Sequence, residues 1–199
     1  MSNDEWDIYA VNEVREWIFA LDRETRKRVV EAIDVLAACG PGLGRPLVDV
    51  ISGSSLRNLK ELRPGTVRIL FVFDPWRACI LLVAGEGSRR GAAAMSGYAR
   101  WQDIRADLVE GVGGEEAVAL GKQRLLAEVL GHRLAEIRQS RGLSRQQVAN
   151  RMGVTEERIA EIEQGSISGH DVLVRYAAAL GGRYHQSIYF DDGDIAAIA

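Results

Sequence analysis

The sequence predicts a small α+β domain, made of two helices and an antiparallel sheet, joined to a mainly α-helical domain that ends in a strand. Three observations predict this arrangement. Apolar residues recur at helical spacing over residues 14–37, β-branched and aromatic residues lie between turn signals over 56–84, and helical spacing returns after residue 96. A chain of 199 residues is also long enough for two small domains with separate cores.

Two helices are expected first, after a short strand candidate at residues 6–9. The first helix has one apolar face, formed by Val14, Trp17, Ile18 and Leu21. Asp22 suits the N-cap of the second helix, which Gly40 and Pro41 end. Turn signals at 64–65 and 74–75 then predict antiparallel strands at about 56–63, 67–73 and 78–84.

Positive charge is concentrated on the predicted sheet. The strands, or positions beside them, carry Arg57, Lys60, Arg63, Arg68 and Arg77. In an ideal strand Lys60 and Arg63 project to opposite faces, so a single cluster requires strand twist, a bulge or the strand ends. The pattern alone leaves two interpretations open, solvated surface charges and a site for a negatively charged ligand.

The residues around these cations carry a resemblance. The segments GPGLGRPLVDVI, KELRPGTVRILFVFDP and ILLVAG resemble the RelE/HigB superfamily of toxins, in particular its phage-derived branch, over about residues 5–86. The resemblance implies a compact RelE-like α+β fold and ribosome-dependent cleavage of messenger RNA.

That activity would use the cations. When a ribose 2′-hydroxyl attacks the adjacent phosphate, negative charge builds on the phosphoryl oxygens, which guanidinium and ammonium donors stabilise. The resemblance therefore makes Lys60, Arg63 and Arg68 the candidate catalytic residues. Residues 1–94 contain no histidine, which excludes an imidazole acid/base pair.

The last predicted strand leads into the sequence GEGSRRGAAA and then Met95. The toxin branch has a lysine-bearing turn and an aromatic tail here; the lysine is missing, and Tyr98 and Trp101 fit either a displaced remnant of the tail or a new segment. From Met95 onward the chain resembles a complete HigA-type antitoxin. We therefore predict a shortened toxin module over 1–86, a flexible linker over 87–95 and an antitoxin over 96–199.

Residues 132–165 of the second half predict a helix-turn-helix. Ser144 suits the cap of RQQVANRM, Gly153 the tight turn, and Thr155 the cap of EERIAEIEQ. The apolar positions that would pack the two helices together are Val148, Ala149, Val154, Ile159 and Ile162. The candidate DNA-binding residues are Ser144, Arg145, Gln146, Thr155, Glu156, Glu157, Arg158 and Glu161.

The predicted reading helix is acidic. Its carboxylates are unfavourable near phosphates, although glutamate can accept a hydrogen bond from cytosine N4. Affinity is expected from Arg145, Arg151 and Arg158, and from a second copy in a dimer. The other interpretation is a helix-turn-helix retained for packing or for binding a protein partner.

A further helix at about 170–180 and a strand at about 183–190 should end the chain. A lone terminal strand exposes its backbone edge, so pairing with a symmetry mate predicts a homodimer through the antitoxin part.

Composition sets further limits. The net charge of −3 means that binding of nucleic acid must be local rather than through bulk charge. The sequence has no apolar run long enough to cross a membrane and starts without a signal peptide pattern, which predicts a cytoplasmic protein without membrane partners. Cys39 and Cys79 lack metal-ligand spacing, so we expect no metal, cofactor or disulfide.

Two functions follow. In the first, the chain is a toxin–antitoxin fusion that acts mainly as a sequence-specific, DNA-binding autorepressor on operator DNA, with a neutralised or degenerate toxin module. In the second, the module is a metal-independent mRNA endonuclease, acting on messenger RNA at the ribosome and held inactive by the fused antitoxin. The sequence favours the first, because the toxin family's lysine-bearing turn is missing.

Overall fold

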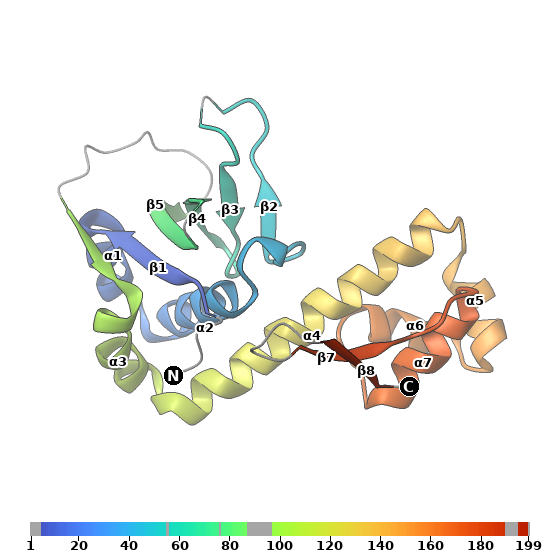
Figure 1. Ribbon diagram of the computed structural model, residues 1–199. Coiled ribbons are helices and arrows are strands. Elements are labelled where there is room, and N and C mark those ends of the chain that lie inside the picture. The colour runs from blue at the N-terminus through green and yellow to red at the C-terminus, as the bar shows by residue number, and fades with distance from the viewer. Residues whose placement is uncertain (1–4, 55, 76, 87–96, 190–194, 199) are drawn as a thin grey trace. The chain divides into compact units, whose positions relative to one another are not determined.

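The computed structural model describes residues 5–54, 56–75, 77–86, 97–189 and 195–198. It divides into two compact units, residues 1–129 and residues 130–199, which we call the first and second units (Figure 1). No helix within the described ranges is long and apolar enough to cross a membrane.

The first unit is built on a six-stranded sheet with the order β2-β3-β4-β5-β1-β6. Its strands are β1 (Asp7–Val11), β2 (Val48–Val50), β3 (Lys60–Leu62), β4 (Val67–Phe73), β5 (Ala78–Glu86) and β6 (Tyr98–Arg100). Only β1 and β5 pair in parallel; the other described pairs are antiparallel. The three predicted strands are therefore present as β3, β4 and β5, and β3 is shorter than the predicted 56–63.

Two helices precede the central strands, as predicted. They are α1 (Asn12–Ala20) and α2 (Arg23–Cys39). The Asp22 Oδ1 caps α2 by accepting hydrogen bonds from the backbone N–H groups of Glu24 and Thr25, both at 3.0 Å. The apolar residues of α2 are buried and form the centre of the core with β4. The unit contains a third helix, α3 (Trp101–Val112), so the two-helix description of this domain is incomplete.

The segment after residue 96 completes the first unit. Strand β6 runs beside β1 at the sheet edge, with Ala10 opposite Ala99 (Figure 1). Helix α3 buries Trp101, Ile104, Leu108, Val109 and Val112 in the same core as α2. The boundary between the two compact units therefore lies at 129/130 rather than near residue 90. Strand β6 pairs with the edge of β1, and α3 packs on the apolar face of α2, so both belong to the first unit.

The second unit is mainly helical. The long helix α4 (Gly114–Ser140) ends in it, followed by α5 (Arg145–Met152), α6 (Glu156–Glu163) and α7 (His170–Ala179). The chain closes with β7 (Gln186–Tyr189) and β8 (Ile195–Ile198), which pair antiparallel. The terminal strand expected to be alone is therefore paired along one edge by the chain itself, and pairing with a second copy stays a prediction.

Candidate nucleic-acid interface

The structure divides the three candidate cations of the toxin module between two faces of the sheet. Lys60 and Glu61 are consecutive in β3, so their side chains point to opposite faces. The Lys60 ammonium donates to the Pro41 carbonyl at 3.1 Å and lies 5.6 Å from the centre of the Phe73 ring. Arg63 and Arg68 instead both approach the buried Glu61. The structure therefore brings together two of the three predicted residues.

The pair of arginines is held by neighbouring acceptors. The Arg63 Nε donates to Glu61 at 2.7 Å and its Nη2 lies 3.1 Å from Asp49. Arg68 Nη1 donates to the carbonyls of Gly65 and Val67 at 2.8 and 2.7 Å. Both side chains remain about one-third exposed, and these acceptors fix them in place.

In the second unit, α5 and α6 form the predicted helix-turn-helix. The Ser144 hydroxyl accepts from the Gln147 N–H while the Gln147 side chain accepts from the Ser144 N–H, which makes a capping box. Thr155 caps α6 by accepting from the Arg158 N–H at 3.2 Å, and Gly153 has the left-handed conformation of a C-cap. The predicted packing residues are confirmed, with Val154 half-buried and the other four buried: Val148, Ala149, Val154, Ile159 and Ile162.

A buried carboxylate holds this motif together. Glu163, at the end of α6, accepts from Arg138 at 2.5 and 3.0 Å, from Arg145 Nε at 2.8 Å and from the Tyr176 hydroxyl at 2.8 Å. Burial would raise the pKa of Glu163, but these donors hold the pKa below its ordinary value. The network links α4, α5, α6 and α7 through one charge.

The predicted DNA-contacting arginines already have partners within the unit. Arg145 donates only its Nε to Glu163 in the described contacts, and 43% of its side chain stays exposed. Arg158 bonds Glu161 at 2.8 Å and also Ser166 and Ser168. Arg145 can therefore reach a phosphate as it stands, whereas Arg158 must exchange existing bonds to reach a base.

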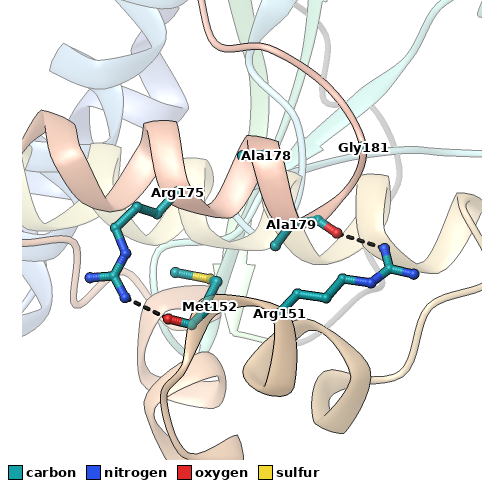
Figure 2. Close-up of a pocket in the computed structure, with 6 residues that line it drawn as sticks. All are labelled: Arg151, Met152, Arg175, Ala178, Ala179 and Gly181. Atoms are coloured by element: carbon teal, nitrogen blue, oxygen red, sulfur yellow. Dashed lines mark hydrogen bonds between the residues drawn. The ribbon is translucent and has the colours of Figure 1, made fainter.

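Arg151 lies at the far end of α5 from the Ser144 cap. Figure 2 shows it across a cavity of about 430 Å³ from Arg175, with Met152 between them. Arg151 donates to the Ala179 carbonyl of α7 at 2.7 Å, and Arg175 donates to the Met152 carbonyl of α5 at 2.6 Å. Each arginine thus caps the C-terminal end of the other's helix. Arg151 uses one Nη nitrogen in this contact and stays exposed, so its contribution to DNA affinity stays a prediction.

The outward surface of the motif is mixed in charge. The other predicted residues of this set are exposed, namely Ser144, Gln146, Thr155, Glu156, Glu157 and Glu161. Arg141, in the turn before α5, is also exposed. Sequence reasoning treated Arg141 only as a helix end.

Sequence reasoning also missed a polar network in the first unit. The buried Asp34 of α2 accepts from the Trp101 indole at 2.8 Å and from Arg105 at 2.7 to 3.0 Å, and Arg105 also pairs with Glu115. These contacts fix α3, and the start of α4, onto α2.

Comparisons with known proteins agree with the two resemblances noted in the sequence. A family model described as phage derived protein Gp49-like (DUF891) matches residues 16–90, and one described as a helix-turn-helix domain matches residues 129–182. The putative toxin HigB3 of Mycobacterium tuberculosis is 44% identical over 98 residues, which is 48% of this chain and 80% of HigB3. The putative antitoxin HigA3 of the same organism is 43% identical over 86 residues, which is 41% of this chain and 79% of HigA3. The chain belongs to the HigB/HigA toxin–antitoxin family.

A third relative is matched over less than half of its own length. The putative toxin HigB2 of Mycobacterium tuberculosis is 46% identical over 98 residues, and the match spans 47% of this chain but only 45% of HigB2. The resemblance noted in the sequence is thus confirmed, with HigB-like residues first and HigA-like residues second. In this HigB/HigA chain, the HigB-like part carries the arginine pair at Glu61 and the HigA-like part carries the helix-turn-helix.

Proposed function

We propose that the chain acts mainly as a sequence-specific, DNA-binding autorepressor whose HigB-like module is neutralised within the same chain. The observation that carries this proposal is the capped α5–α6 pair, in which Glu163 holds Arg145 at the N-terminus of α5. Glu163 already orders the Arg145 side chain through its Nε. The two Nη groups can therefore bind a DNA phosphate with little further loss of conformational entropy. Such a repressor would work in the cytoplasm.

Dimeric binding follows from the small number of contacts in one motif. An acidic reading helix with a single arginine gives little specificity, whereas two copies on half-sites about 34 Å apart double the base and phosphate contacts. We expect the operator to have two-fold symmetry and the base-reading residues to include Arg158 and Glu157.

The test is a salt series of binding of the full chain to the promoter of its own gene and to a random duplex. Arg145→Ala should weaken binding to both duplexes and reduce the salt slope by about one, since one phosphate contact is lost. Arg133→Ala is the matched control, because Arg133 is an exposed arginine on α4 that pairs with Glu136. Equal binding of the two duplexes by the wild-type chain at low salt would show that the motif is a protein-binding module.

The second candidate function is an mRNA endonuclease held inactive by its fused antitoxin. It is favoured by the fixed, partly exposed pair of Arg63 and Arg68, which suits a phosphate whose charge grows during cleavage. Lys60 would act from the other face of β3, so it would bind a neighbouring part of the RNA rather than the same phosphate.

A further inference from the structure

A cavity of about 260 Å³ lies beside the arginine pair of the first unit. One wall is formed by Arg63, Arg68 and Leu47 of the HigB-like part. The cavity is also lined by Leu125, Glu128 and Val129 of α4, which follow the Gp49-like match at residues 16–90. The candidate RNA-binding arginines therefore face a helix that lies beyond the toxin-like residues in the sequence.

The sequence of α4 explains why this helix can lie so close to α2. A Cβ atom at Gly121 would be 1.9 Å from the carboxylate of Glu31 on α2, so the absence of a side chain permits the approach. Val118 is buried on one side of this contact, and Leu125 and Val129 pack against the same core on the other. The α4 segment 118–129 is thus seated by apolar contacts and by one close approach.

We propose that α4 residues 121–129 form an inhibitory cover over a phosphate-binding pocket made by Arg63 and Arg68. The inference rests on the proposed assignment of these arginines to RNA phosphate. Two features of the cover oppose RNA: the helix lines the cavity beside the guanidinium groups and so narrows access to it, and the Glu128 carboxylate places negative charge on the lining that an incoming phosphate would have to meet. Arg124 lies 3.7 Å from Glu128 and keeps that carboxylate on the helix.

The experiment displaces the cover in the full chain. Leu125→Lys with Val129→Lys keeps good helix formers in α4, removes its apolar contacts and adds charges that Arg63 and Arg68 repel. The matched control is Leu120→Lys with Leu126→Lys, which adds the same charge to the same helix at exposed positions. Gly121→Leu is a second route to displacement, because its side chain collides with Glu31.

The first readout is independent of any RNase activity. Phenylglyoxal reacts with accessible guanidinium groups, and peptide mass spectrometry gives the modification rate of each arginine. Arg63 and Arg68 should react more slowly than Arg45, which is more exposed, in the wild-type chain and in the control. In the displaced variants this protection should be lost, while circular dichroism shows that the helical content is kept.

The second readout is cleavage of messenger RNA on ribosomes by the same proteins. Loss of protection with cleavage supports both the cover and the RNA assignment. Loss of protection without cleavage supports the cover and overturns the assignment of Arg63 and Arg68 to RNA chemistry. Unchanged protection in both displaced variants, or equal loss in the control, overturns the cover.

Discussion

Each unit contains a buried carboxylate that binds several of its helices together. The two units differ in where the hydrogen-bond donors to that carboxylate come from. In the second unit, Glu163 receives donors from Arg138, Arg145 and Tyr176, all within residues 130–199. In the first unit, Asp34 lies within the Gp49-like match at residues 16–90 and receives donors from Trp101 and Arg105, which follow that match.

The difference shows that the first compact unit extends beyond the Gp49-like match at residues 16–90, up to residue 129, where the helix-turn-helix match begins. The helix-turn-helix closes its polar network within residues 138–176. The HigB-like residues 5–86 leave the β1 edge and Asp34 to be satisfied by the segment that follows the junction. The compact unit that contains the Gp49-like match is therefore completed by β6, by α3 and by the first part of α4.

The largest expected effect comes from breaking the network of the second unit. Glu163→Ala leaves the buried Arg138 without its carboxylate, which should destabilise the second unit by about 3 to 5 kcal/mol. All four tryptophans lie in residues 1–129, so tryptophan fluorescence should report an unchanged first unit during urea unfolding. Amide hydrogen exchange should show the loss of protection in α5, α6 and α7.

The pH dependence of the same network has a defined sign. The pKa of Glu163 is held below its ordinary value, so its contribution to stability is present above that ordinary value and is lost as the pH falls. Glu163→Gln should remove this acid sensitivity from the second unit. An equally acid-sensitive variant would contradict the role of the charge.

A smaller effect is expected from the network around Asp34 of the first unit. Trp101→Phe keeps the buried ring but removes the indole N–H that Asp34 accepts, which should destabilise the first unit by about 1 to 3 kcal/mol in urea unfolding. Trp17→Phe, at a half-buried position against the same core, is the control for loss of an indole. Similar stability of the two variants would show that the Trp101–Asp34 bond does not hold α3 in place.

The elements that the sequence predicted best are those whose signals are local. The Ser144 capping box, the Gly153 turn and the Thr155 cap each involve residues a few positions apart, and the structure has all three. The strand β6 and the docking of α3 depend on contacts between residues about ninety positions apart, such as Ala10 with Ala99. A three-residue strand has no periodicity of its own to detect.

The candidate sites show the same limit. Ideal strand geometry already predicted that Lys60 and Arg63 would lie on opposite faces, and the structure has them apart. Arg63 and Arg68 meet at Glu61 because of the strand pairing and because Glu61 is buried. A buried glutamate is not expected from sequence, since this residue type is mostly exposed in proteins. Cross-capping by Arg151 and Arg175 likewise requires the packing of α5 against α7.

The smallest expected effect tests Glu31, a buried carboxylate of the first unit. Glu31 is 1% exposed, and its Oε2 accepts no hydrogen bond in the described part of the chain. Its nearest cations are Lys27 and Arg124, at 3.8 and 3.6 Å. Burial raises the pKa of Glu31 above its ordinary value, and these cations only partly oppose the rise.

The sign of the resulting pH dependence is opposite to that of Glu163. Because the pKa of Glu31 is raised in the folded state, the folded chain holds the proton more tightly, and stability falls as the pH rises from the ordinary glutamate value through the raised one. Glu31→Gln should therefore stabilise the first unit at neutral pH, by under about 1 kcal/mol since the two cations lose a partner. Urea unfolding followed by tryptophan fluorescence at pH 4, 5.5 and 7 measures it. A variant that is less stable than the wild type at pH 7 would contradict this expectation. It would show that the ion pairs of Glu31 with Lys27 and Arg124 outweigh the cost of burying its charge, so that the charged carboxylate holds α4 onto α2.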